Sequence, residues 1–271
     1  MLKRRIKRIF ALFGALPLMD RLHFLSERIR HARRNRAFLK TANGFPLPPD
    51  EYLHETYRLS YRDYALDGAI TARELVDRIR PWLQTDDADL LEWGCGVARI
   101  TRHLPGLPGI GRVTGADIHP GMIDWNAAHI KGVTFVKIPN EPPTCLPSKG
   151  YDAVIGVSVL THIPADRQQT WLMEIYRLLK PNGIFLFTTH GTAFHRLISN
   201  GELKRLLSEG CLTHTYPKAG HRMMTTLHDA TILKKWLSEY VEIVCHIEGE
   251  TDPTAAGGQD LWIVRKLGTK D

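Results

Sequence analysis

Leu90-Leu-Glu-Trp-Gly-Cys-Gly-Val-Ala-Arg99 is the most informative segment of this 271-residue chain. It reads as an apolar strand with an acid near its end, followed by a Gly-x-Gly turn that opens into a helix. Glycine has no Cβ, so the backbone at Gly94 and Gly96 allows a ligand to approach closely. Because such a turn also occurs for structural reasons alone, a ligand site needs support from the sequence around it.

Short apolar runs alternate with helical stretches after this segment. The predicted strands are 89–93, 112–116, 133–136, 153–157 and 184–188. This alternation is typical of a parallel sheet whose crossover helices cover both faces. Residues 241–247 and 261–266 predict two more strands, joined by a glycine-rich loop rather than by a helix. We therefore expect an α/β fold with a mostly parallel sheet, an antiparallel C-terminal strand pair and an N-terminal helical extension.

Asp117 ends the second predicted strand, about twenty residues after the turn, where a carboxylate can accept hydrogen bonds from ribose hydroxyls. A dinucleotide-binding fingerprint would need a third glycine, but position 99 is Arg. This departure disfavours an NAD-dependent oxidoreductase, which would also give no reason for the C-terminal strand pair. Glu92 beside the turn instead suits a phosphate-free nucleoside that carries a positive charge.

Several motifs occur together in a characteristic order: Glu92-x-Gly94-x-Gly96, Asp117, Tyr151-Asp-Ala-Val-Ile155 with Val159-Leu-Thr-His162, and Leu178-Leu-Lys-Pro-Asn-Gly183. Over residues 85–266 this order resembles class I, Rossmann-like methyltransferases that depend on S-adenosylmethionine (SAM). Phe187-Thr-Thr-His-Gly191 and Gln259-Asp-Leu-Trp262 further resemble a bacterial subgroup often associated with glycan or secondary-metabolite genes.

The resemblance implies which residues hold SAM. Gly94 and Gly96 would line its methionine part, and Glu92 would steer the amino group directly or through water. Asp117 would hold the ribose, and Ile118 would lie against adenine.

Two further positions follow from the same resemblance. Asn140 falls where the family has a polar side chain near the adenine amino group, although residues 138–143 depart from the usual Gly-Asp-Ala pattern. Ser158 and His162, after the fourth strand, would face the methyl donor. No metal site is predicted.

A methyl transfer to a hydroxyl benefits from a general base within reach of the acceptor. His190 is the first candidate because it ends the fifth strand, at the carboxyl edge of the sheet where ligands bind. His162 is the second candidate. Capping of the strand is an equally good explanation for His190, and shaping of a loop is one for His162.

Two segments are expected to bind the substrate: an insertion at 192–240, which would cover the pocket, and the helices that precede the first strand. Polar and aromatic side chains on these segments give the substrate-binding candidates Tyr61, Tyr64, His221, Arg222 and His228.

The charge of the chain is unevenly distributed. Residues 1–40 hold twelve Lys or Arg side chains against two acidic ones, whereas the whole chain has a net charge of only +7. The body is therefore mildly acidic, which disfavours a catalytic domain that grips a polyanion. We expect a basic arm at 1–44, a helical lead-in at 45–84 and a SAM-binding domain at 85–271.

Within the arm, Ile6, Ile9, Phe10 and Phe13 share one helical face between basic residues. The apolar stretch is too short to span a bilayer. Peripheral contact with an anionic membrane and packing on the protein's own core or a partner are both consistent with this pattern. Four scattered cysteines without a Cys-x-x-Cys pair indicate a reducing compartment and hence a cytoplasmic protein.

These observations predict a SAM-dependent methyltransferase with a small-molecule or glycan acceptor, methylated at oxygen. An RNA methyltransferase that uses the basic arm is the main alternative, and an NAD-dependent oxidoreductase is the weaker one. Amino methylation commonly uses an Asn/Asp-Pro-Pro-aromatic motif after the fourth strand, where this chain has Val157-Ser-Val-Leu-Thr161. Nucleic acid is therefore not the expected partner, and nothing in the sequence indicates an oligomeric state.

Overall fold

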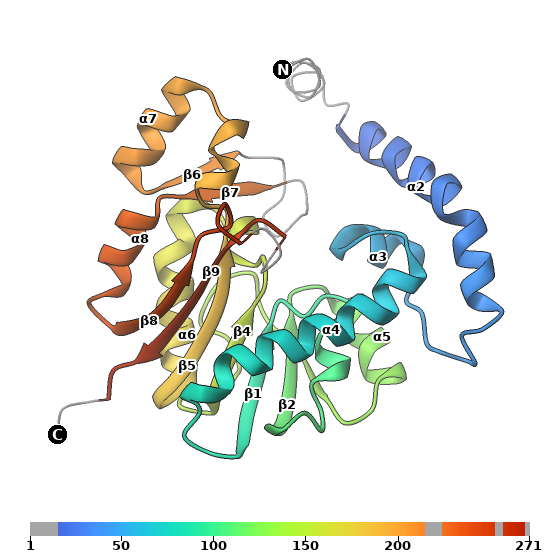
Figure 1. Cartoon of the computed structure of the whole chain (residues 1–271), viewed down its shortest axis with the longest axis horizontal. Helices are drawn as coiled ribbons and strands as arrows, with labels where there is room; N and C mark the ends of the chain where they lie inside the picture. The colour runs from blue at the N-terminus through green and yellow to red at the C-terminus, as the bar shows by residue number, and fades with distance from the viewer. Residues whose placement is uncertain (1–15, 215–223, 253–256, 269–271) are drawn as a thin grey trace. The chain divides into compact units, whose positions relative to one another are not determined.

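The computed structural model describes residues 16–214, 224–252 and 257–268 (Figure 1). Two compact units are present, Met1–Gly68 and Ala69–Asp271, and their boundary falls inside helix α4 (Tyr61–Ile79). The predicted division at 44 and 84 stays a prediction. The basic helix predicted around residues 6–13 lies outside the described residues.

The first unit contains α2 (Leu16–Leu39), α3 (Asp50–Thr56) and the beginning of α4. Asn35 of α2 joins the helices because its Nδ2 donates to the Leu59 carbonyl (2.8 Å) and its Oδ1 accepts from the Tyr61 amide (3.1 Å). Phe45 packs edge-on against both Phe38 and Tyr64. The unit is thus held by a side-chain amide and an aromatic cluster.

The second unit is built on a seven-stranded sheet in the order β3-β2-β1-β4-β5-β9-β8. The first five strands in this order are parallel, β9 is antiparallel to β5, and β8 is antiparallel to β9. This confirms the predicted fold. The strands are β1 (Asp87–Trp93), β2 (Gly109–Asp117), β3 (Thr134–Lys137), β4 (Tyr151–Gly156), β5 (Leu179–Thr189), β8 (Val241–Ile247) and β9 (Asp260–Lys266).

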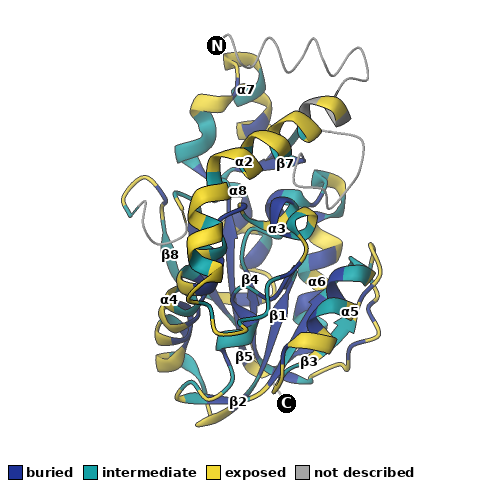
Figure 2. Ribbon diagram, turned by 90° about the vertical axis from the view of Figure 1, so that its right-hand side faces the viewer, coloured by how far each residue is buried: buried dark blue, intermediate teal, exposed yellow. Residues whose placement is uncertain are grey.

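Successive side chains along the central strands enter different cores, as the period of two requires. Leu90 and Leu186 pack with the Ala69–Ile79 part of α4, whereas Leu91 and Phe185 pack with α6 (Gln168–Leu178). Figure 2 shows these strands buried along most of their length. The remaining helical elements of the main domain are η1 (Arg80–Trp82), η2 (Thr101–His103), α5 (Pro120–His129), η3 (Leu160–His162) and η4 (Ala165–Arg167).

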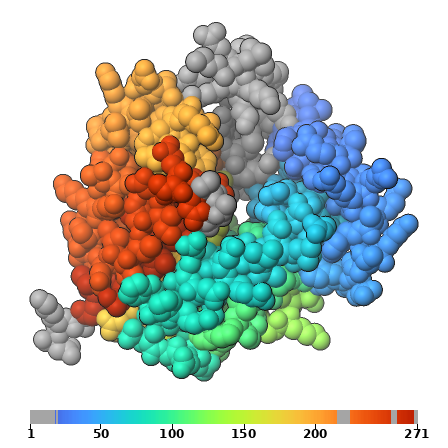
Figure 3. All heavy atoms as spheres, in the orientation of Figure 1, coloured from blue at the N-terminus to red at the C-terminus, as the bar shows by residue number. Residues whose placement is uncertain are grey.

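The insertion at 192–240 has a small core of its own, formed by Ile198, Leu206, Leu212 and Leu227. Its elements are η5 (Thr192–Leu197), α7 (Asn200–Glu209), β6 (Cys211–His214), β7 (Thr225–His228) and α8 (Ala230–Leu237). In the space-filling view the orange surface of α7 and α8 continues into the red C-terminal strands (Figure 3). The described residues of the insertion, 192–214 and 224–240, are thus a folded part of the second unit.

Within the described ranges, no helix combines the length and the apolar character that a bilayer crossing requires.

Candidate functional site

The carboxyl ends of four neighbouring parallel strands carry most of the predicted site residues. Glu92 and Gly94 lie at the end of β1, Asp117 at the end of β2, Ser158 after β4 and His190 after β5. Since these strands are adjacent in the sheet, their ends form one row along its edge (Figure 1). We call the carboxyl ends of β1 and β2 the cofactor half, and the carboxyl ends of β4 and β5 together with the beginning of the antiparallel β9 the acceptor half.

The glycine turn of the cofactor half is held by backbone contacts. The amides of Gly94 and Cys95 both donate to the carbonyl of Ala116 in β2, at 2.8 and 3.1 Å. Gly94 has a φ of +74° and Gly96 one of +51°, a region that favours glycine. A Cβ at Gly94 would come within 2.5 Å of the Val159 side chain. Only glycine therefore keeps this turn open.

Two side chains fasten the turn from the β2 side. Asp117 Oδ2 accepts from the Gly96 amide and its Oδ1 accepts from the His119 amide, both at 2.8 Å. Asn126 of α5 donates to the Gly96 carbonyl at 2.8 Å and is fully buried. Burial raises the pKa of Asp117, and these backbone bonds oppose the rise. Because a carboxylate has about four acceptor positions, Asp117 can also accept from a ribose hydroxyl.

Glu92 lies inside the protein with only 4% of its surface exposed, and it accepts a short hydrogen bond from Thr101 Oγ1. Burial raises its pKa to about 7, although the Thr101 bond and Arg99 lower it. The carboxyl therefore changes charge near neutral pH. Its predicted role of steering an amino group stays a prediction.

The geometry fits SAM at the cofactor half. The turn keeps its shape only with glycine at position 94, because an added Cβ would overlap the Val159 side chain. Beside it, the hydrogen-bonded Asp117 carboxylate suits the hydroxyl groups of a nucleoside without phosphate. SAM would supply a methyl group on a sulfonium sulfur. Ile118 is half-buried against the core, and Asn140 is exposed after β3, so their adenine contacts stay predictions.

The acceptor half is a network of side chains. Ser158 has a φ of +63°, and its amide donates to Thr188 Oγ1 at 2.7 Å. Thr188 Oγ1 in turn donates to Gln259 Oε1 at 2.6 Å. The amide nitrogen of Gln259 donates to Ser158 Oγ at 2.9 Å and lies 3.5 Å from His190 Nε2. Residues from β4, β5 and β9 thus meet at one point.

His190 belongs to this network, and its ring is enclosed by neighbouring side chains. Its ring stacks on Phe194 with centroids 4.0 Å apart, and its carbonyl accepts from the His228 amide at 2.9 Å. Burial lowers its pKa to about 4, the charge of His162 lowers it further, and the backbone of Thr226 acts in the opposite direction. The imidazole is therefore neutral at physiological pH, and the Gln259 amide faces Nε2 as a donor.

The other candidates lie in different surroundings. His162 Nδ1 is 2.9 Å from the Met224 carbonyl. His228 is fully buried, its Nε2 lies 3.2 Å from Gln168 Oε1, and burial lowers its pKa to about 3.

Among the remaining candidates, Tyr61 donates a hydrogen bond to Asp50 at 2.8 Å. Burial and this bond raise the pKa of Tyr61 to about 12. Tyr64 is buried. His221 and Arg222 lie outside the described residues. Substrate contacts of these residues stay predictions.

Several residues of this edge were not assigned a role from the sequence, among them Thr101, Asn126, Thr188 and Gln259. Asn126 could have been noticed as a polar residue on the buried face of a helix. Gln259 belongs to a motif that resembles a known subgroup, but its partner Ser158 is 101 positions away.

Comparisons with known proteins agree with this geometry. Residues 91–187 match the family model of a methyltransferase domain. A SAM-dependent methyltransferase from Methanosarcina mazei is 20% identical, with a TM-score of 0.52, and the match covers 70% of this chain and 97% of that one.

Two further solved structures share the fold. An amino pentose methyltransferase from Micromonospora echinaspora, with SAM bound, is 15% identical with a TM-score of 0.53, covering 76% of this chain and 94% of that one. The 1,6-didemethyltoxoflavin-N1-methyltransferase of Burkholderia thailandensis, with S-adenosylhomocysteine, is 19% identical with a TM-score of 0.51, covering 74% and 78%. No curated protein sequence matches the chain. At these identities the likeness concerns the fold.

Proposed function

We propose that this chain, which is a class I SAM-dependent methyltransferase, transfers the methyl group to a hydroxyl oxygen of a small-molecule or glycan acceptor. The observation that carries the proposal is His190. A half-buried imidazole with a pKa of about 4 is neutral at physiological pH, and it stands at the carboxyl edge beside Ser158 and Gln259.

The chemistry assigned to His190 follows from its contacts. The Gln259 amide faces Nε2 as a donor, so the lone pair of the neutral ring is on Nε2. An acceptor hydroxyl that replaces this long contact can pass its proton to Nε2 as its oxygen bonds to the methyl carbon. The carbon–sulfur bond breaks in the same displacement, and the electron pair remains on sulfur.

The acceptor class is supported by charge. Outside residues 1–40 the chain carries more acidic than basic residues, which disfavours a polyanionic substrate. Small-molecule acceptors occur on this fold, as in the amino pentose enzyme, but the likeness itself is limited to the fold. The residues of this chain therefore carry the proposal.

The test replaces His190 and separates turnover from cofactor binding. With labelled SAM and fractionated extracts as acceptor source, His190→Ala should lower turnover roughly 10²- to 10⁴-fold. SAM affinity in calorimetric titration should stay near that of the parent protein. His129→Ala, an exposed histidine on α5, is the matched control and should change neither quantity.

The pH profile gives a second readout. Because protonation removes the lone pair, the rate of the parent protein should be flat above about pH 5 and fall as the pH drops through about 4. Unchanged turnover of His190→Ala and of His190→Gln over this range would contradict the role of a base.

We also propose a cytoplasmic location with peripheral membrane contact through residues 1–40. The four cysteines are all free, and the segment carries a large excess of basic residues. Deletion of residues 1–40 should abolish sedimentation with phosphatidylserine vesicles. Equal sedimentation of both forms would assign the arm to another role.

A further inference from the structure

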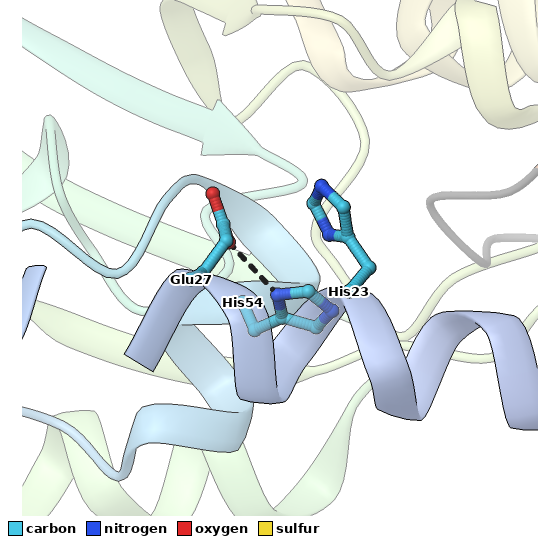
Figure 4. A group of neighbouring side chains, drawn as sticks. All are labelled: His23, Glu27 and His54. Atoms are coloured by element: carbon cyan, nitrogen blue, oxygen red, sulfur yellow. Dashed lines mark hydrogen bonds and ion pairs between the residues drawn. The ribbon is translucent and has the colours of Figure 1, made fainter. Parts of the chain in front are cut away.

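Three side chains with metal-ligating groups converge in the first unit, far in sequence from the methyltransferase site. His23 and Glu27 lie one turn apart on α2, and both project toward His54 of α3 (Figure 4). One ligand atom from each residue lies within 4.8 Å of the other two. The spacing i, i+4 places His23 and Glu27 on the same face of the helix, so the backbone presents them together.

The environment of His54 gives a second observation. Its side chain is only 6% exposed and lies between two carboxylates, with Nδ1 3.0 Å from Glu27 Oε2 and Nε2 3.4 Å from Asp20 Oδ1. A carboxylate that accepts from one ring nitrogen fixes the proton there and leaves the lone pair of the other nitrogen for a metal. With the ion bound, Asp20 would accept from Nε2 of His54, and Nδ1 would face the ion beside Glu27.

We propose that His23, Glu27 and His54 bind a divalent transition-metal ion, for which Zn²⁺ fits best, with Asp20 as the positioning residue of His54. Two imidazoles and one carboxylate form a known ligand set for Zn²⁺, with water in the fourth position. Mg²⁺ and Ca²⁺ prefer oxygen ligands, so they suit this set poorly.

Binding requires a small contraction of the cluster. Tetrahedral Zn²⁺ with bonds of about 2.0–2.1 Å places its ligand atoms roughly 3.4 Å apart. The His54–Glu27 pair, at 3.0 Å, is slightly closer than this and would open by a few tenths of an ångström, while His23 moves inward. His23 is exposed on α2 and can adjust by rotation of its side chain. The ion would fasten α2 to α3, and its role is separate from the proposed methyl transfer.

The full-length protein, stripped with EDTA and dialysed, should bind one Zn²⁺ per chain in calorimetric titration. Binding to the folded state should also raise the melting temperature, since a ligand specific to the native protein stabilises it. Ca²⁺ and Mg²⁺ should produce neither effect. Affinity should fall on acidification, because protons compete for the imidazole nitrogens.

The variants separate coordination from folding. His23→Ala changes an exposed residue, and Glu27→Gln keeps an acceptor for His54, so both should fold and should lose Zn²⁺ binding at least 100-fold. Asp20→Asn should weaken it roughly 10- to 100-fold, as loss of a positioning partner does. His129→Ala removes an exposed histidine of α5 and should bind like the parent.

Two results would overturn the proposal. One is a parent protein without a 1:1 Zn²⁺ isotherm, which would leave His54 as a buried group clamped between Asp20 and Glu27. The other is parent-like affinity in His23→Ala and Glu27→Gln. Because the metal-free melting temperature of each variant is measured in parallel, a folding defect is recognised separately.

Discussion

The cofactor half and the acceptor half of the sheet edge are built in different ways. The cofactor half is fastened chiefly through backbone groups at Gly94, Gly96 and Ala116, with Asp117 close by in sequence. The acceptor half is fastened through side chains, and Gln259 reaches Ser158 across 101 positions of sequence. The first half thus depends on local backbone shape, and the second on tertiary packing. Variants of the cofactor half should therefore lose stability or SAM binding, whereas variants of the acceptor half should chiefly lose turnover.

Gly94→Ala should have the largest effect, because it disturbs the backbone conformation on which the cofactor half depends. Its φ of +74° strains any residue with a Cβ, and that Cβ would stand 2.5 Å from Val159. Strain and overlap together should cost about 2–4 kcal/mol of unfolding free energy. Calorimetric titration should show no measurable SAM binding.

Gly106→Ala is the matched control for this variant. Gly106 has nearly the same φ, +78°, but an added Cβ would meet no atom within 4 Å. It should lose only about 1 kcal/mol of stability and keep its SAM affinity. If both variants bound SAM equally well, close approach at Gly94 would not be what the cofactor half requires.

Glu92→Gln should remove a pH dependence of stability that belongs to the cofactor half. The folded protein keeps a proton on Glu92 up to a pKa of about 7, whereas the unfolded chain releases it near 4.5. Between these values the folded state binds more protons, so the unfolding free energy falls as the pH rises. The loss should approach about 3 kcal/mol.

Denaturant titrations at about pH 5 and about pH 8 measure this difference. The parent should lose about 2.5 kcal/mol more than Glu92→Gln between these pH values, while the exposed Glu74→Gln on α4 should behave like the parent. The same pH slope in Glu92→Gln and in the parent would assign the dependence to other groups, of which Asp117 is the nearest.

Asp117→Asn should weaken SAM binding roughly 10- to 100-fold, as expected for loss of a charge-assisted hydrogen bond. One of the two backbone bonds to Gly96 and His119 is also lost, because the amide group offers only one acceptor oxygen. Asp124→Asn removes an exposed carboxylate of α5 and controls for the change in net charge. Parent-like affinity in Asp117→Asn would remove the ribose assignment.

The same contrast explains what the sequence predicts. The glycine turn, Asp117 and the order of the strands follow from local patterns, since each strand end is one crossover away from the next. The Gln259 network depends on chain segments far apart in sequence that meet only after folding. The His23–Glu27 pair is visible as a helical spacing, but its third partner is 27 positions further along.

Gln259→Met should have the smallest effect and should be confined to the acceptor half. Methionine keeps the length of the side chain but removes the bonds to Ser158 and Thr188, which are half-buried or buried groups. Since Ser158 Oγ retains Thr161 at 3.0 Å, the loss of stability should be about 1 kcal/mol.

The reason to expect a kinetic effect from Gln259→Met is the position of His190. Without the amide, the ring of His190 loses a contact that orients it before an acceptor binds, so turnover should fall about tenfold, equivalent to about 1.4 kcal/mol, while SAM affinity stays unchanged. Gln84→Met, exposed before β1, is the matched control.

A loss of SAM affinity in Gln259→Met would mean that the two halves are coupled through Ser158 and Val159, which lies against Gly94. Unchanged turnover would instead show that His190 is positioned by Phe194 and the backbone alone.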